Sequence, residues 1–180
     1  LKNILVKFPD LPIHLLEMGF GTGLNAWITS IESAKLNKII IYTGIEAFPV
    51  DMEVIEKLNY PDLLKDSKSQ FVDLHNASWE VKNQLSDHFY LTKIKTHFEK
   101  VTFQDEFHLI YYDAFGARVQ PELWTIALFE QMYEAQKKDG VLVTYSAKGS
   151  VRRAMMEVGF IVERLPGPPG KREMLRATKS

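Results

Sequence analysis

The sequence contains no cysteine, and this absence excludes several kinds of protein at once. A chain without thiols has no disulfides, no thiolate metal sites and no cysteine nucleophile, and it fits a cytoplasmic protein better than a secreted one. Long apolar runs are also lacking, because none approaches the roughly 20 residues of a membrane-spanning helix. Residues 1–10 do not have the pattern of a signal peptide. We therefore expect a protein without membrane association.

An excess of charge of one sign is lacking too. The 22 basic and 23 acidic residues give a net charge of -1, so no global basic field indicates nucleic acid, although a local patch remains open. The five histidines show no metal-ligand spacing, and we predict no metal site. The 180 residues, 46% of them hydrophobic, suffice for one domain with a sizeable core over 1–180. The oligomeric state is not indicated.

Strand-like and helix-like segments alternate along the chain, which favours a parallel sheet covered on both faces by helices. Residues 59–90 contain packed apolar residues whose structure the pattern does not fix. A final strand pair replaces the second mononucleotide half of a dinucleotide dehydrogenase, and resembles the class I methyltransferase sheet with its antiparallel last strand. The predicted fold is thus α/β, a Rossmann-like doubly wound sheet, with strands at 13–18, 38–46, 90–96, 107–112, 141–145, 160–165 and 173–178 and helices at 24–34, 50–58, 122–138 and 150–158.

A glycine-rich segment, 17–25, joins the first predicted strand to the first predicted helix. Its alternate glycines let the backbone turn sharply and approach a ligand, and the helix N-terminus favours an anionic group. Glu46 ends the next strand, where an acid can accept hydrogen bonds from ribose hydroxyls. Each feature alone has a structural explanation, a tight turn or a loop acid. Together they predict a nucleoside-containing ligand, whose amine Glu17 would face.

Asp113 follows the fourth predicted strand, at the edge where open α/β sheets bind ligands. An alkylamine with a pKa near ~10 is mostly protonated at neutral pH. A carboxylate can orient this ammonium, accept its proton and stabilise the charge that develops on nitrogen. Asp113 is therefore a candidate catalytic acid for methylation of an amine; the alternative is a turn-forming aspartate. Phe115 is open to three interpretations: a cover over the methyl group, a base-stacking platform or a core residue.

Basic residues gather late in the chain, where they would flank the carboxyl edge of the sheet and the terminal hairpin. Such a rim suits phosphate contacts to RNA. The alternative is an ordinary solvated face. The residues are Lys148, Arg152, Arg153, Arg164, Lys171, Arg172 and Arg176.

Five segments together, 17–25, 44–49, 112–125, 144–153 and 170–177, resemble one family. It is the family of bacterial tRNA 5-aminomethyl-2-thiouridine methyltransferases, found free-standing as MnmD and as a domain of bifunctional MnmC. The resemblance implies an N-methyltransferase that uses S-adenosyl-L-methionine. It would convert 5-aminomethyl(-2-thio)uridine at the tRNA wobble position to the methylaminomethyl form, with Asp113 as the catalytic or orienting acid.

The resemblance also implies which residues hold the two substrates. The third strand of the family tends to end in an acid near the adenine, whereas Thr96 and His97 stand there in this chain, so we expect backbone and stacking contacts instead. The chain begins almost at the first strand, and we expect the family's N-terminal segment to be missing. The donor-binding candidates are Glu17, Gly19, Phe20, Gly21, Thr22, Gly23, Asn25, Glu46, Ala47, Phe48, Thr96 and His97, and the tRNA-binding candidates are Phe115, Lys148, Arg152, Arg153, Lys171 and Arg172.

Other functions fit part of the same pattern. Aminopropyltransferases of the polyamine type share the ribose acid and a fourth-strand aspartate, and a small-amine methyltransferase would need the same acid. A module that binds S-adenosyl-L-methionine or RNA without catalysis is a third alternative. Such a binder has no need for an acid at the reaction centre, so Asp113 disfavours it.

Overall fold

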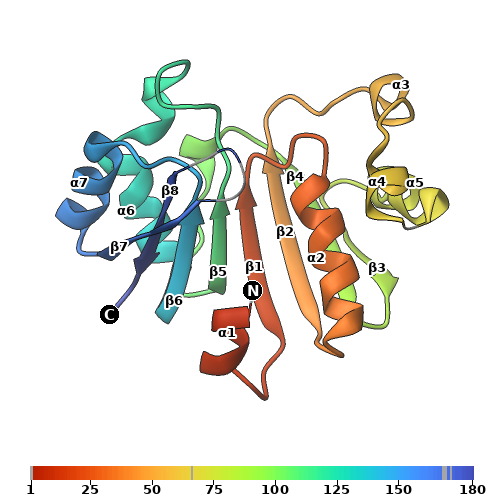
Figure 1. The fold of residues 1–180 in the computed structure, drawn as a ribbon, viewed down its shortest axis with the longest axis horizontal. Coiled ribbons are helices and arrows are strands. Elements are labelled where there is room, and N and C mark those ends of the chain that lie inside the picture. The colour runs from red at the N-terminus through yellow and green to blue at the C-terminus, as the bar shows by residue number, and fades with distance from the viewer. Residues whose placement is uncertain (1, 66, 168–169, 171) are drawn as a thin grey trace.

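The computed structural model describes the whole chain except residues 1, 66, 168–169 and 171 (Figure 1). Within the described residues, eight strands form one sheet in the order β3-β4-β2-β1-β5-β6-β8-β7. The strands are β1 (Ile13–Met18), β2 (Ile40–Glu46), β3 (Lys82–Ser86), β4 (Phe89–Lys95), β5 (Phe107–Tyr112), β6 (Gln136–Thr144), β7 (Ile161–Pro166) and β8 (Glu173–Thr178). The helices are α1 (Lys2–Lys7), α2 (Leu24–Lys35), α3 (Met52–Ile55), α4 (Tyr60–Leu64), α5 (Lys68–Asn76), α6 (Ile126–Ala135) and α7 (Gly149–Val158), with 3-10 turns η1 (Phe98–Lys100) and η2 (Pro121–Trp124).

The centre of the sheet is parallel. β1 pairs with β2 on one side and β5 on the other, and the parallel arrangement continues to β4 and β6. β8 inserts antiparallel between β6 and β7. From β1 the chain first builds outward through β2 and β4 and then returns to β5, so the strand order reverses beside β1. This confirms the predicted doubly wound fold with an antiparallel last strand, and it puts the ligand crevice at the carboxyl ends of β1 and β5.

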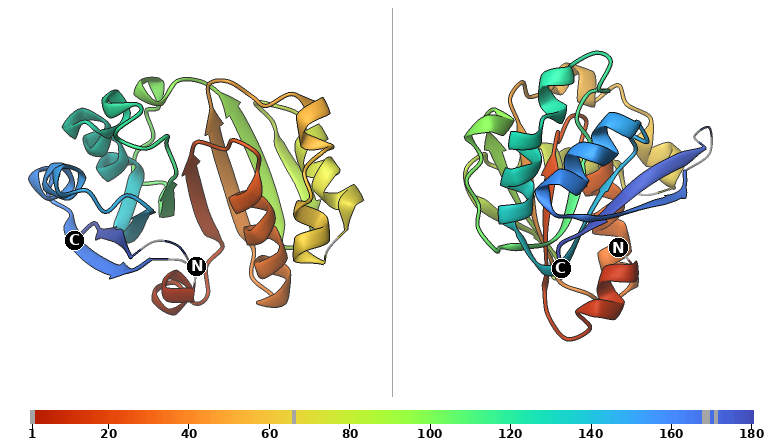
Figure 2. Two further views of the ribbon diagram at one scale, coloured as in Figure 1. Left: turned by 45° about the horizontal axis from the view of Figure 1, so that its top comes forward. Right: turned by 90° about the vertical axis from the view of Figure 1, so that its left-hand side faces the viewer.

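Helices cover both faces of the twisted sheet (Figure 2). Successive residues of a strand point to opposite faces, and β1 is buried along almost its whole length. Leu15 belongs to a core with Trp27 of α2 and Phe71 of α5. Leu16 belongs to the other core, with Phe129 of α6 and Met155 of α7. The near-continuous apolar run of this strand follows from its burial on both sides.

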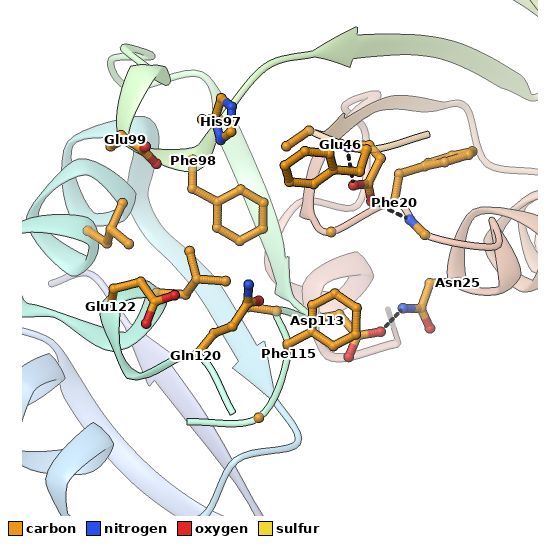
Figure 3. Close-up of a pocket in the computed structure, with 18 of the residues that line it drawn as sticks. Phe20, Asn25, Glu46, His97, Phe98, Glu99, Asp113, Phe115, Gln120 and Glu122 are labelled. Carbon is orange, nitrogen blue, oxygen red and sulfur yellow. Dashed lines mark hydrogen bonds between the residues drawn. The ribbon is translucent and has the colours of Figure 1, made fainter. Parts of the chain in front are cut away.

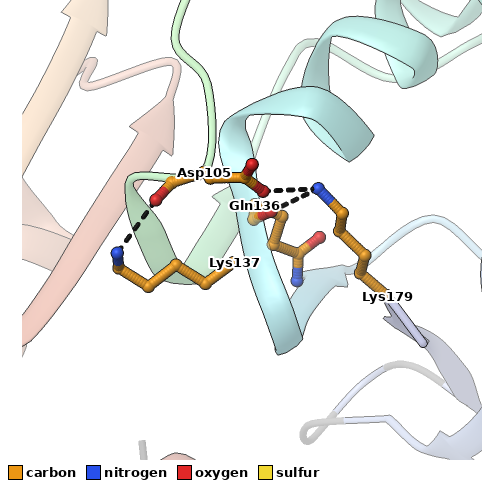
Figure 4. Close-up of polar contacts among 4 residues, drawn as sticks. All are labelled: Asp105, Gln136, Lys137 and Lys179. Carbon is orange, nitrogen blue, oxygen red and sulfur yellow. Dashed lines mark hydrogen bonds and ion pairs between the residues drawn. The ribbon is translucent and has the colours of Figure 1, made fainter.

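The predicted helix over 122–138 is wrong at both ends. Thr125 caps α6, where its hydroxyl accepts from the Leu128 backbone N–H at 3.4 Å, and the helix ends at Ala135. From Gln136 the chain is already in β6, which pairs with β5. Lys179 donates to the Gln136 carbonyl oxygen at 2.7 Å and to Asp105 at 2.8 Å (Figure 4). Tertiary contacts with β5 and with Lys179 therefore override the helix-ending pattern of residues 137–140.

Two other predicted segments also differ. The helix predicted over 50–58 is only α3, residues 52–55, because Ile55 is its one buried residue and a longer helix would have little apolar surface to bury. The segment 59–90, which the pattern left open, forms α4, α5 and β3, and β3 pairs antiparallel with β4. This insertion packs beside the glycine turn and matters for the site.

Candidate functional site

A cavity of about 1150 Å³ opens at the carboxyl ends of the central strands (Figure 3). It is larger than the roughly 300–1,000 Å³ typical of a pocket for one small ligand. The lining includes Asp113 and Phe115 together with these predicted donor-binding residues: Gly19, Phe20, Gly21, Thr22, Asn25, Glu46, Ala47, Phe48 and His97. Glu17, Gly23 and Thr96 lie outside the lining.

The glycine turn runs between the ends of β1 and β2. The backbone N–H groups of Gly19 and Phe20 both donate to the Ile45 carbonyl oxygen, at 3.0 and 2.9 Å. Gly19 has a φ of 96°, and a Cβ atom there would lie 2.8 Å from the Asp113 carbonyl oxygen. Only glycine combines this conformation with such a close approach. The turn is thereby held directly against the residue predicted to be catalytic.

Residues from the α4–α5 insertion support the turn from behind. The hydroxyls of Thr22 and Tyr60 share a hydrogen bond of 3.1 Å. The His75 ring packs so tightly against Gly23 that a Cβ there would lie 3.0 Å from it. Lys93 is buried and donates to the His75 carbonyl oxygen at 2.5 Å, and burial lowers the pKa of Lys93 to about 8. The sequence prediction missed this support, although Tyr60 and His75 lie in the segment where packed residues were noticed.

The Glu46 carboxylate is fixed at the end of β2. One oxygen accepts from the Gly21 backbone N–H and the other from the Phe48 backbone N–H, both at 2.9 Å. Each carboxylate oxygen has a further lone pair, which can accept from a hydroxyl in the cavity. This fixed pair of acceptor oxygens suits the two hydroxyls of a ribose.

Glu17, Asn25 and Asp113 form a continuous polar chain that runs from the buried Glu17, behind the cavity, to Asn25 and Asp113 in its lining. The Asn25 side-chain nitrogen donates to Glu17 Oε1 and to Asp113 Oδ2, each at 2.8 Å. Tyr42 donates to the other Glu17 oxygen at 2.7 Å. Burial raises the pKa of Glu17 to about 8, against the lowering effect of the Tyr42 and Asn25 hydrogen bonds and with a further raising effect of the Asp113 and Glu46 charges.

The backbone of Ala114 and Phe115 is anchored by hydrogen bonds, whereas the Phe115 side chain is exposed. Tyr145 donates to the Ala114 carbonyl oxygen at 2.5 Å and Trp124 to the Phe115 carbonyl oxygen at 2.8 Å. Trp124 is buried in the core, whereas the Phe115 side chain is 71% exposed and lines the cavity. Of the three interpretations of Phe115, a core residue is therefore excluded.

The side of the cavity beyond β4 differs from the prediction. The Thr96 backbone N–H donates to the Glu46 carbonyl oxygen at 3.2 Å, so this residue links β4 to β2 without lining the cavity. His97 lines it and contacts Phe48 edge-on, with ring centroids 5.6 Å apart. Glu99, on η1, also lines the cavity and was missed. A short 3-10 turn predicted after this strand would have placed Glu99 near the cavity.

The predicted tRNA-binding cations stand outside the cavity. Lys148 immediately precedes α7, which carries Arg152 and Arg153, and α7 follows the carboxyl end of β6. The other described cation of this set, Arg172, is exposed beside the terminal hairpin. Lys171 lies outside the described residues. Two other cations of the stretch pair with acids across the hairpin, Arg164 with Glu173 at 3.0 Å and Arg176 with Glu163 at 2.8 Å.

Two kinds of feature are absent from the described part of the chain. It contains no cluster of three or more histidine or acidic side chains arranged to hold a metal ion. No helix among these residues is long and apolar enough to cross a membrane.

The chain is similar in sequence to known methyltransferases. A family profile described as S-adenosyl-L-methionine-dependent methyltransferase matches residues 60–180. The bifunctional protein MnmC, of tRNA 5-methylaminomethyl-2-thiouridine biosynthesis, is 27% identical in Hydrogenovibrio crunogenus and 31% identical in Stutzerimonas stutzeri, over 92% and 93% of this chain. The match covers 26% and 27% of these relatives, so the chain spans about a quarter of their length.

Solved structures share the fold. MnmC2 from Aquifex aeolicus superimposes with a TM-score of 0.69 at 21% identity, covering 97% of this chain and 55% of that one. Spermidine synthase from Thermotoga maritima superimposes with a TM-score of 0.57 at 19% identity, covering 95% of this chain and 54% of that one. At these identities the likeness concerns the fold alone.

Proposed function

The chain belongs to the family of S-adenosyl-L-methionine-dependent methyltransferases, and on this premise we propose that it methylates an aminomethyl group on a wobble uridine of tRNA. The acceptor is the primary amine of 5-aminomethyl(-2-thio)uridine, and the product is the methylaminomethyl form. The similarity to the MnmC proteins supports this acceptor.

One observation carries the proposal: the Asp113 carboxylate lies on the wall of a cavity that also contains the fixed Glu46 and the glycine turn. A donor bound between Glu46 and the turn would bring its methyl group toward the end of β5. The cavity volume of about 1150 Å³ leaves room for an acceptor group beside the donor. A carboxylate at that point suits an acceptor that arrives as a cation.

The residues of the turn and of β2 would hold the donor. Glu46 would accept from the ribose hydroxyls, and the backbone of the glycine turn would face the methionine part. Glu17 lies behind the lining and would act only through Asn25, to which it is hydrogen-bonded. S-adenosyl-L-methionine supplies, when bound, an electrophilic methyl group on a sulfonium. The protein's contribution is to bind and orient the two partners and to exclude water.

Asp113 would act on the acceptor. Its carboxylate orients the substrate ammonium, accepts the proton that must leave before nitrogen can attack, and stabilises the positive charge on the methylated amine. Phe115, exposed two residues later, offers a flat face on which an unstacked base can lie. The basic residues Lys148, Arg152 and Arg153 would contact phosphates of the tRNA, as would Arg172 and Lys171.

The proposal is tested by methyl transfer from labelled S-adenosyl-L-methionine to tRNA from a strain lacking this activity, with mass spectrometry of the nucleosides. We expect a new methylaminomethyl uridine with the wild-type protein. Asp113→Asn should reduce the rate by about 100-fold or more, as for removal of a general base, with donor affinity in calorimetry retained. Asp87→Asn, an exposed aspartate in the β3–β4 turn, serves as the matched control.

Two results would contradict the proposal. Transfer to small diamines but not to tRNA would point to an amine of another class. Donor binding without transfer to any amine would point to a binding module.

A further inference from the structure

We infer that Asn25 is a positioning residue that holds the Asp113 carboxylate in its reactive orientation and ties it to Glu17. The inference rests on the proposed function in that Asp113 is taken as the acid that meets the acceptor amine. It goes further in assigning to one amide group the link between the donor side and the acceptor side of the site.

The geometry uses both hydrogens of the amide. Asn25 Nδ2 lies 2.8 Å from Glu17 Oε1 and 2.8 Å from Asp113 Oδ2. A primary amide nitrogen carries two N–H donors that point in different directions, so one nitrogen can serve both carboxyl groups. Asn25 is the second residue of α2, two residues after Gly23, whose backbone is in the left-handed conformation, and its side chain points to Asp113 at the end of β5 (Figure 3).

The backbone of Asp113 is already fixed by other contacts. Its N–H donates to the Met18 carbonyl oxygen at 3.0 Å, and its own carbonyl oxygen lies where only a glycine at position 19 leaves room for it, since a Cβ atom there would be 2.8 Å away. The side chain, by contrast, is exposed, and an exposed aspartate has several open rotamers. The Asn25 contact selects one of them. With Oδ2 bonded to Asn25, Oδ1 is the oxygen left to meet an acceptor in the cavity.

Glu17 gives the other end of the link a fixed support. It is 1% exposed, and Tyr42 holds its second oxygen at 2.7 Å. Asn25 donates to Oε1, so its contact survives whether or not a proton sits on Oε2. Two carboxyl groups this close repel each other when both are charged, and the neutral amide between them supplies one donor to each.

The link is specific for an amide of this length. Serine or threonine offers one donor in place of two, and aspartate offers none while adding a third acid. Glutamine would carry the nitrogen one methylene further, away from a position that satisfies both contacts. We therefore expect no other natural side chain at position 25 to hold Asp113 as asparagine does.

A double-mutant cycle measures whether Asn25 acts through Asp113. Asn25→Ala should lower the methyl-transfer rate at saturating donor by about 100-fold, because a small misplacement of a reacting group has an effect of that size. In an Asp113→Ala background the same change should lower the rate by less than about threefold, since nothing remains to be positioned. Asn76→Ala, at the end of α5 and outside the cavity lining, is the matched control. If Asn25→Ala lowered the methyl-transfer rate by the same factor in both backgrounds, the inference would be overturned.

A second measurement does not depend on turnover. In the NMR spectrum of the protein alone, both side-chain amide protons of Asn25 should be shifted downfield and exchange slowly, because both are hydrogen-bonded. Asp113→Ala should release one proton and Glu17→Ala the other. If Asp113→Ala left the chemical shifts and exchange rates of both Asn25 amide protons unchanged, the inference would be overturned even in an active enzyme. If the wild type methylates no amine while both amide protons respond as expected, the proposed function fails and the Asn25 contact stands.

Discussion

At the scale of single residues, a buried acid gives the fold a dependence on pH that can be measured. Glu17 is 1% exposed, and burial raises its pKa from 4.5 to about 8. In the unfolded chain the same carboxyl ionises near pH ~4.3. Between these two pH values, ionisation of the carboxyl lowers the free energy of the unfolded state but not that of the folded state. Stability should therefore fall as the pH rises from about 5 to about 8.

Glu17→Gln removes this loss, because glutamine has no charge to bury. Each pKa unit corresponds to ~1.4 kcal/mol, so the variant should gain on the order of 4 kcal/mol relative to wild type at pH 8 and little at pH 5. Urea unfolding at several pH values measures the difference, with the exposed Glu56→Gln as the control. A gain of the same size at every pH would show that Glu17 does not titrate in this range.

At the scale of elements, β6 begins with a residue that is costly to bury. Gln136 is fully buried, and neither atom of its side-chain amide has a hydrogen-bond partner among the described residues. An unpaired buried amide costs roughly 1–3 kcal/mol. Lys179 bonds the Gln136 backbone carbonyl, a contact that does not depend on the side chain.

Gln136→Met keeps the length of the side chain and removes the unpaired groups, so we expect stability to rise by about 1–2 kcal/mol. Position 136 lies at the opposite end of β6 from Tyr145 and the cavity, and methyl transfer should be unchanged. Thermal and urea unfolding measure the first effect and a turnover assay the second. Lower stability in the variant would mean that a buried water pairs the amide in solution.

The same element marks how far local sequence patterns reach. Strands buried on both faces, such as β1 and β5, were predicted from their apolar runs, and both to the residue. Residues 136–138 were predicted as the last turn of a helix, because the two lysines there and Gly140 just beyond them match a common helix ending. What decides their strand conformation is the pairing of Gln136 with Phe107 of β5 and the hydrogen bonds that Lys179 forms with Gln136, Asp139 and Gly140, and both partners are distant in sequence.

The candidate site also contains residues that the sequence predicted and residues that it did not. Gly19, Glu46 and Asp113 were predicted because the position of each at the end of a strand carries a chemical meaning. The Tyr60 hydroxyl on Thr22, the His75 ring on Gly23 and the cavity-lining Glu99 were not. These contacts depend on how the α4–α5 insertion folds back on the turn and on a 3-10 turn after β4. Short helices with few buried residues have little periodicity from which to predict them.

At the scale of the whole molecule, the near-neutral chain would have to bind a polyanion with one local surface. The net charge is -1, so long-range attraction to tRNA cannot come from the total charge. The cations beside α7 are the candidates for that surface, because Lys148, Arg152 and Arg153 follow directly from the strand end that carries Tyr145. On the terminal hairpin, by contrast, Arg176 pairs with Glu163.

Arg152→Gln combined with Arg153→Gln should weaken tRNA binding without changing the rate at saturating tRNA. Each phosphate contact contributes roughly 0.7–0.9 to the slope of log affinity against log salt, so losing two contacts should reduce that slope by about 1.5. Filter binding or fluorescence titration between low and physiological salt measures it. Arg164→Gln, whose partner is Glu173, serves as the control and should leave the slope unchanged. An unchanged slope in the α7 variant would move the RNA surface elsewhere, because a phosphate contact cannot be lost without releasing its share of the salt dependence.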